Sequence, residues 1–354
     1  MLEKYLKNGD SYGCHRVIEP KGVFPQPALK INNSTNVIWD NEILVNVESL
    51  NIDSASFSQI KRKANGKAEG IKDIILDIVQ RRGKMHNPDT GSGGVFIGRV
   101  DEIGDKLINK CGLKRGDKIV SLVSLSLTPL QIHEIYEVKT AIDQVKVNGK
   151  AVLFESGIYT KLPEDIPETL ALAVLDVCGA PAQTARLVKC NDTVVIIGAG
   201  GKSGILCAYE ARKVIGNGGK IIGITHSTKS TNNIQKIGVC DSILELDAQN
   251  ASLCYKEILK VTENKLANLV INCANVPDTE LSSILMCREM GKVYFFSMAT
   301  SFTTASLGAE GIGKDIDMII GNGYTKGHAE MALNILRESK EIRSLYDEIY
   351  NGFT

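Results

Sequence analysis

A glycine-rich turn between two apolar runs constrains the fold of this chain more than any other feature. Residues 198–204 read Gly-Ala-Gly-Gly-Lys-Ser-Gly, with a strand-like run at 194–197 before them and a helix-like run at 205–211 after them. Glycines let the chain turn tightly and let backbone N–H groups approach a pyrophosphate, and the following helix N-terminus adds a partial positive charge. We therefore predict a dinucleotide phosphate site here, with a tight turn that binds no ligand as the alternative.

Strand-like and helix-like segments alternate through residues 166–325. The helical patterns include 203–214, 252–261 and 279–290. Six apolar runs have the length of buried strands: 193–197, 220–225, 242–246, 269–273, 293–297 and 317–320. Such alternation is typical of a doubly wound parallel sheet, so we predict a Rossmann dinucleotide-binding domain over 166–325.

The first 165 residues have a different pattern. Short apolar runs separated by turns are typical of an antiparallel, barrel-like domain. These runs are 43–47, 94–100, 118–123 and 151–155. Isoleucine and valine at helical spacing over 71–79 predict one helix, which ends at Gly83. We place this domain at 1–165, and we expect a C-terminal helix and tail at 326–354 that packs back toward the cleft between the domains.

Composition argues against several classes of partner. Lys plus Arg and Asp plus Glu each total 41, so the net charge of zero disfavours nucleic acid and anionic membranes. We found neither an apolar run of about 18 residues nor a signal-peptide pattern. The 9 cysteines are scattered, with no C-x-x-C pair, which favours reduced thiols and a cytoplasmic location.

The order of the two domains resembles the medium-chain dehydrogenase/reductase superfamily. Residues 98–104, 112–120 and 161–165 are similar to its G-x-V-x-x-x-G, G-x-x-x-G-D-x-V and K-L-P motifs, and 198–204 matches the G-x-x-G-x-x-G loop of its quinone-reductase branch. The resemblance implies a GroES-like catalytic domain before the Rossmann domain. It also implies NAD or NADP as cofactor, and a homo-oligomer, either a dimer or a tetramer, formed near residues 317–320.

Residues 12–27 and 47–57 narrow this resemblance to the amine dehydrogenases of lysine fermentation. The resemblance implies oxidative deamination of (3S,5S)-3,5-diaminohexanoate at C3, giving 5-amino-3-oxohexanoate, ammonia and reduced cofactor. Two alternatives stay open: a zinc-independent quinone or enoyl reductase, and a nucleotide-binding redox sensor without enzymatic activity.

The zinc ligands of the superfamily's alcohol dehydrogenases are largely missing. Ile52 stands at the first ligand position and Gly93-Gly94-Val95 at the G-H-E segment, so that only Cys178 matches. One thiolate cannot hold a tetrahedral zinc ion, and we predict that the enzyme uses no metal. Amine oxidation instead requires a base that deprotonates an ammonium group, whose pKa is about 10.

Four residues are candidates for this acid–base chemistry. Asp53 and Ser54 occupy the loop that carries catalytic groups in the resembled superfamily, and helix capping is their alternative role. Glu155 follows the apolar run 151–154 and is a candidate base or ammonium anchor, or else a solvated strand end. Asp176 lies in an apolar run and needs a partner if it is buried. Arg16 is a candidate for pairing with the substrate carboxylate.

The candidate cofactor residues lie at the predicted strand ends. An NAD site usually has an acid after the second strand, whereas here Thr225, His226, Ser227 and Lys229 offer hydroxyls and cations that suit the 2′-phosphate of NADP. The enzymes of the resembled branch are described with NAD, so this choice stays open. The complete set is Gly198, Gly200, Gly201, Lys202, Ser203, Gly204, Thr225, His226, Ser227, Lys229, Ala274, Asn275 and Ser297.

Overall fold

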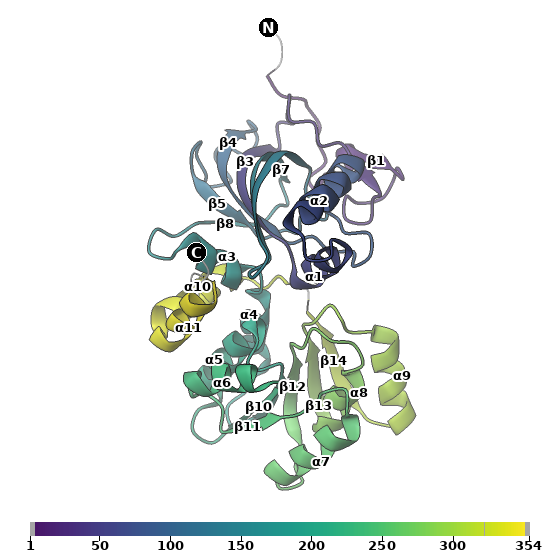
Figure 1. Cartoon of the computed structure of the whole chain (residues 1–354), viewed down its shortest axis with the longest axis vertical. Helices are drawn as coiled ribbons and strands as arrows, with labels where there is room; N and C mark the ends of the chain where they lie inside the picture. Colours follow the sequence, from purple (N-terminus) through teal and green to yellow (C-terminus); the bar gives the residue numbers. More distant parts are fainter. Residues whose placement is uncertain (1–3, 322, 351–354) are drawn as a thin grey trace. The chain divides into compact units, whose positions relative to one another are not determined.

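The computed structural model describes residues 4–321 and 323–350, which fold into two compact units that meet in the sequence between Asp176 and Val177 (Figure 1). No helix in these ranges is both long enough and apolar enough to cross a membrane. The domain boundaries predicted near residues 165 and 325 stay predictions.

The N-terminal unit is built on an antiparallel sheet with the strand order β6-β7-β3-β4-β5-β8. Its strands are β3 (Glu42–Asn51), β4 (Val95–Ile103), β5 (Lys118–Ser121), β6 (Leu130–Lys139), β7 (Gln144–Phe154) and β8 (Tyr159–Lys161). A smaller sheet pairs β1 (Val17–Glu19) with β2 (Lys30–Ile31), and a short helical turn, η1 (Cys14–Arg16), precedes it. The predicted β-rich N-terminal domain is confirmed.

Three helices accompany this sheet, and one of them begins just after its central strand β3. They are α1 (Ser54–Lys63), α2 (Ala68–Arg82) and α3 (Glu168–Leu175). The predicted helix over 71–79 is α2, whose buried isoleucines join the core of the unit, and Gly83 ends it with φ 73°. Because α1 begins three residues after β3 ends, its N-terminus lies at the end of that strand.

The C-terminal unit is a six-stranded parallel sheet with the order β11-β10-β9-β12-β13-β14. Its strands are β9 (Thr193–Ile197), β10 (Lys220–Thr225), β11 (Ser242–Glu245), β12 (Ala267–Asn272), β13 (Cys287–Phe295) and β14 (Ile316–Ile320). The six predicted strands are confirmed. The predicted helix over 279–290 is too long, because α8 ends at Met286 and Met290, with φ 53°, already belongs to β13.

Helices cover both faces of this sheet, as Figure 1 shows. One group consists of α4 (Gly179–Leu187), α5 (Lys202–Ile215), α6 (Thr228–Ile237), α10 (His328–Glu338) and α11 (Lys340–Tyr350), and the other of α7 (Ala251–Val261), α8 (Glu280–Met286) and α9 (Phe302–Ile312). The strand order reverses between β9 and β12. In such sheets, ligands bind at this switch point, beyond the carboxyl ends of the strands.

Candidate active site

The glycine loop after β9 has the geometry of a phosphate cradle. Gly198 turns the chain with φ 75°, and a Cβ on Gly204 would lie 2.2 Å from the Gly198 carbonyl oxygen. A Cβ on Gly201 would meet only that oxygen, at 3.3 Å, so this side of the loop is open. Gly201 is the N-cap of α5, and it has no side chain to occupy the N–H groups of the first turn. These features fit a dinucleotide pyrophosphate at the N-terminus of α5.

The end of β10 lies against the first turn of α6. Ser227 caps this helix, since its hydroxyl accepts a hydrogen bond from the Ser230 N–H at 3.3 Å in a reciprocal capping box. The Thr225 hydroxyl lies 2.7 Å from the hydroxyl of Thr231. His226 and Lys229 are exposed. Two of the groups predicted to suit a 2′-phosphate, the hydroxyls of Thr225 and Ser227, are thus engaged within the protein.

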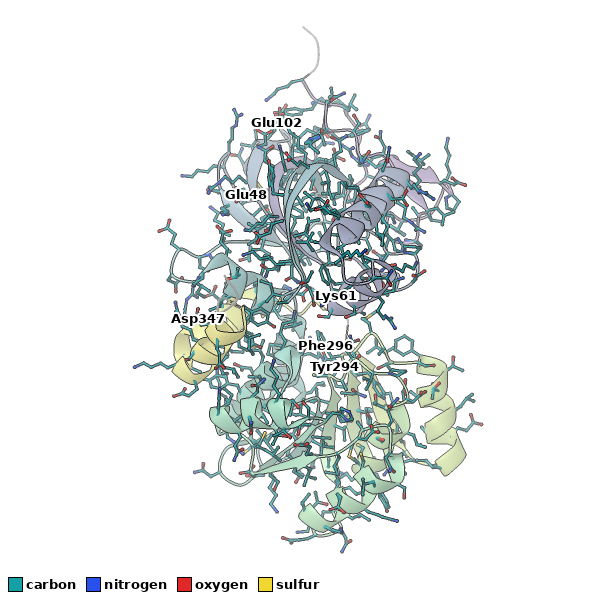
Figure 2. All side chains as sticks on the ribbon, viewed as in Figure 1. Glu48, Lys61, Glu102, Tyr294, Phe296 and Asp347 are labelled. Atoms are coloured by element: carbon teal, nitrogen blue, oxygen red, sulfur yellow. The ribbon has the colours of Figure 1, made fainter. Side chains whose placement is uncertain are left out.

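The remaining cofactor candidates follow β12 and β13. The Ala274 N–H donates to Asn272 Oδ1 at 3.1 Å, while Asn275 is exposed and Ser297 is half-buried. Tyr294 is buried at the end of β13 (Figure 2). The candidates therefore gather at the carboxyl ends of four strands of one unit, and their individual roles stay predictions.

In the N-terminal unit, Asp53 ends a chain of hydroxyl groups at the start of α1. Its Oδ1 accepts a hydrogen bond from the Ser56 N–H at 3.0 Å, and its Oδ2 accepts one from the Ser92 hydroxyl at 2.6 Å. The Ser92 hydroxyl lies 2.9 Å from that of Ser56 and 3.2 Å from that of Thr90, and the last two are also hydrogen-bonded to each other. We call Asp53, Ser56, Thr90 and Ser92 the Asp53 cluster. Asp53 and Ser54 are half-buried, so the carboxylate is not closed off from solvent.

Two glycines let the loop of Ser92 pack closely against its neighbours, and one of them approaches the end of β3. A Cβ on Gly94, which has φ 109°, would lie 2.0 Å from the Asn51 carbonyl oxygen. A Cβ on Gly93 would lie 2.4 Å from the Met85 carbonyl oxygen. A side chain at either position would push the loop away, so the glycines permit the hydrogen bond between Ser92 and Asp53.

Glu155 lies at the other end of the same sheet. β3 and β7 run antiparallel, and their register pairs the start of β3 with the end of β7. Glu155 directly follows β7, whereas Asp53 follows β3, so most of the length of a ten-residue strand separates them, about 30 Å. Glu155 is exposed and accepts hydrogen bonds from Ser11 Oγ at 3.1 Å and Asn41 Nδ2 at 3.4 Å. The structure does not bring Glu155 together with Asp53, and these contacts are those of a solvated strand end, which is the alternative to a catalytic role.

Arg16 is wholly buried in an ion pair, and our expectation that it binds the substrate carboxylate is wrong. Its Nε and Nη2 donate to the two oxygens of Glu42, both at 2.6 Å. His15 Nε2 lies 2.9 Å from Glu42 Oε1, and the Trp39 N–H donates to Oε2 at 3.0 Å. The Arg16 guanidinium also lies over the Trp39 ring, 4.8 Å from its centre. We call His15, Arg16, Trp39 and Glu42 the Glu42 cluster.

Burial and hydrogen bonding act in opposite directions on the pKa of Glu42. Burial raises the pKa of this carboxyl group, but the hydrogen bonds from Arg16 and His15 outweigh it and hold the pKa below its ordinary value of 4.5. The carboxylate is therefore charged and fully paired, which is a structural role.

The positions of Asp176 and Cys178 do not test the prediction that the enzyme uses no metal. Asp176 is the half-buried C-cap of α3, and Cys178 is buried as the N-cap of α4. Within 4–321 and 323–350, no three His, Cys, Asp or Glu side chains are grouped so that they could hold a metal ion. The catalytic role of Asp176 and the absence of a metal both stay predictions.

The antiparallel sheet of the first unit, and the parallel sheet with its glycine loop in the second, define the class of two-domain proteins with a dinucleotide-binding fold. Solved structures with this fold include an alcohol dehydrogenase from Thermotoga maritima, with TM-score 0.54 and 17% identity over 89% of this chain and 86% of that one. They also include Escherichia coli quinone oxidoreductase complexed with NADPH, with TM-score 0.53 and 16% identity over 86% of this chain and 81% of that one.

Closer relatives identify the family. The model of the L-erythro-3,5-diaminohexanoate dehydrogenase N-terminal domain matches residues 15–163. The enzyme of that name from Acetoanaerobium sticklandii is 56% identical over 97% of this chain and 99% of its own length. Its counterpart from Fusobacterium nucleatum is 54% identical over 98% of this chain and all of its own length. The chain belongs to the L-erythro-3,5-diaminohexanoate dehydrogenase family.

Sequence reasoning missed Ser56, Thr90 and Ser92 as members of the Asp53 cluster. Their hydroxyls meet across 34 and 36 residues of sequence, so spacing alone gave no signal. The run Gly91-Ser92-Gly93-Gly94 was a usable sign, because consecutive glycines indicate a close backbone approach.

Proposed function

We propose that this chain oxidatively removes the 3-amino group of L-erythro-3,5-diaminohexanoate and reduces a nicotinamide cofactor. The proposal rests on the 56% and 54% identity, along nearly the whole chain, to two relatives that carry the name of this dehydrogenase. The diamino acid, water and oxidised cofactor give 5-amino-3-oxohexanoate, ammonium, reduced cofactor and one proton. The alternatives have weaker support, since solved enoyl and quinone reductases share only 13% and 16% identity with this chain.

The glycine loop supports the cofactor part of the proposal. Gly198 and Gly204 give the loop its tight turn and close packing, and Gly201 leaves one side of it open at the N-terminus of α5. Residues 198–204 would hold the pyrophosphate, and the strand ends of β10, β12 and β13 would hold the rest of the dinucleotide. When bound, the nicotinamide ring accepts the hydride.

We assign the role of base to Asp53. The substrate ammonium, with a pKa of about 10, must lose a proton before its lone pair can assist departure of the hydride. The half-buried Asp53 carboxylate can take that proton and release it to solvent, and it can then take a second proton from the water that adds to the imine carbon. Ser92 and the Ser56 N–H orient the carboxylate through its two oxygens, and Ser54 lies beside it on α1.

Three further predictions belong to this proposal. The enzyme works without zinc, because Ile52 and Gly93-Gly94-Val95 stand at two ligand positions of the resembled alcohol dehydrogenases. It acts in the cytoplasm, as the scattered cysteines suggested. It forms a homo-oligomer, a dimer or a tetramer, and the exposed Met318 and Ile320 of the edge strand β14 support the contact near 317–320.

Turnover of the diamino acid tests the proposal. Purified protein is incubated with 3,5-diaminohexanoate and NAD or NADP, before and after dialysis against a chelator. Reduced nicotinamide is followed by absorbance, and ammonia by a coupled assay. Equal amounts of both products, unchanged by the chelator, are expected. No turnover with either cofactor would contradict the proposal, and reduction of quinones or enones instead would favour the alternative enzyme.

A further inference from the structure

A carboxylate from the strand next to β10 belongs to a hydrogen-bonded chain at the edge of the cofactor site. Glu245, the last residue of β11, is the register partner of Thr225, the last residue of β10. The Thr225 hydroxyl lies 2.7 Å from that of Thr231, which donates to Glu245 Oε2 at 2.8 Å. Thr228 Oγ1 donates to Glu245 Oε1 at 3.4 Å. Two hydroxyls of α6 therefore hold the Glu245 carboxylate beside the end of β10.

The same helix packs against the glycine loop. A Cβ on Gly200 would lie 1.9 Å from the Ser230 carbonyl oxygen, so only glycine fits between the loop and α6. Asn233 Nδ2 also donates to the Gly200 carbonyl oxygen at 3.4 Å. One rigid element thus sets the position of Glu245 relative to the loop that would bind the pyrophosphate.

We propose that Glu245 is the residue that selects NAD over NADP. In dinucleotide-binding folds, an acid at the end of the second strand, about 20 residues after the glycine loop, binds the ribose 2′-hydroxyl. This chain has Thr225 there, and the carboxylate reaches the same strand end from β11 instead. A carboxylate can accept a hydrogen bond from a 2′-hydroxyl, whereas it repels a 2′-phosphate, which carries a charge of about −1.5 to −2. This inference rests on one part of the proposed function, which is that a nicotinamide dinucleotide binds at the glycine loop.

The residues at this strand end that could bind a 2′-phosphate are less well placed to do so than Glu245 is to bind a 2′-hydroxyl. The hydroxyls of Thr225 and Ser227 are engaged within the protein, with α6 and in its capping box. His226 and Lys229 are exposed, and a long exposed side chain loses conformational entropy when a ligand fixes it. Glu245 is exposed as well, but two hydrogen bonds from α6 already fix its carboxylate. The local balance therefore favours a 2′-hydroxyl over a 2′-phosphate.

Cofactor binding without substrate tests this assignment. Dissociation constants of NADH and NADPH are measured by titration calorimetry for the wild-type chain, Glu245→Gln and Glu310→Gln. Glu310 is a matched control, because it is an exposed carboxylate on α9, over the other face of the sheet. We expect the wild type to bind NADH at least about tenfold more tightly than NADPH. Glu245→Gln should tighten NADPH binding about tenfold and change NADH binding less than about threefold, and Glu310→Gln should change neither.

Two further measurements sharpen the result. Thr231→Val removes one hydroxyl that holds the carboxylate, and it should shift the affinity ratio in the same direction by a smaller factor. Added salt should reduce the ratio of NADH affinity to NADPH affinity in the wild type and not in Glu245→Gln, since salt screens the repulsion between Glu245 and the 2′-phosphate. Unchanged NADPH affinity in Glu245→Gln, or equal wild-type affinities, would overturn the assignment. Failure to turn over the diamino acid would contradict the proposed function alone, because no binding experiment contains that substrate.

Discussion

The two ends of β3 place carboxylates in opposite environments. Glu42, at its start, is wholly buried, and both its oxygens accept hydrogen bonds from Arg16. Asp53, just beyond its end, is half-buried and accepts hydrogen bonds from a hydroxyl and a helix N–H group. A carboxylate saturated by a buried cation stabilises the fold, whereas one held by neutral donors and open to solvent can exchange a proton. Burial and the charge of the partners thus distinguish the structural acid from the candidate catalytic one.

Removal of the Asp53 charge should have the largest effect. We expect Asp53→Asn to lower kcat by about 10²- to 10⁴-fold, because asparagine cannot take a proton from the substrate ammonium. Asparagine still caps α1, so NADH binding and thermal unfolding should change little. Steady-state kinetics and calorimetry check these outcomes. Glu155→Gln is the control and should keep kcat within about twofold, and a fully active Asp53→Asn would remove Asp53 from the mechanism.

Arg16→Met should have the next largest effect, on the fold rather than on the chemistry. The substitution leaves the Glu42 carboxylate buried without its cation, which costs about 3–5 kcal/mol of unfolding free energy. Urea denaturation measures the loss. The double variant Arg16→Met, Glu42→Gln should recover part of it, because no buried charge remains. A loss below about 1 kcal/mol would show that the pair is not structural.

Ser92→Ala should have a smaller effect on turnover. It removes the hydroxyl that donates to Asp53 Oδ2, so kcat should fall about tenfold with no change in cofactor affinity. Ser92→Thr keeps a hydroxyl at this position and should restore the rate. An equal loss of rate in Ser92→Thr would indicate that the residue acts through packing and not through its hydroxyl.

The pH dependence of stability should show the smallest effect. Because the folded-state pKa of Glu42 is below its ordinary value of 4.5, its pairing stabilises the fold above that pH and the contribution is lost as the pH falls through the folded-state pKa. The wild type should therefore lose unfolding free energy more steeply below about pH 4.5 than Glu42→Gln does. Urea midpoints at several pH values compare the two, and parallel curves would show that Glu42 does not contribute.

The sequence predicted the structure best where a single continuous run of residues determines an element. The central strand β9 of the parallel sheet is buried along almost its whole length, so it is a continuous apolar run, and the glycine loop follows it directly. The edge strand β6 was missed, because half of its residues are polar and only two of its ten residues are buried. The apolar run 171–179 gave no sign that α3 ends at Leu175 and α4 starts at Gly179.

The candidate site was harder to predict because its contacts join distant segments. Asp53 was identified, but its partner Ser92 lies 39 residues further along the chain. Arg16 was singled out from its segment, yet nothing local showed that Glu42, 26 residues away, would bury it. Glu245 comes from the neighbouring strand and not from the strand end where an acid was expected. Long-range pairing decides these roles, and a single sequence does not contain it.

The Glu42 cluster contains the residue that dominates the intrinsic fluorescence of this protein, and it therefore determines which part of the unfolding that fluorescence reports. Trp39 is the single tryptophan of the chain, and it lies in the N-terminal unit against Arg16 and His15. Its fluorescence therefore follows the melting of that unit, while circular dichroism follows both. Comparison of the two signals would show whether the units unfold together or one after the other.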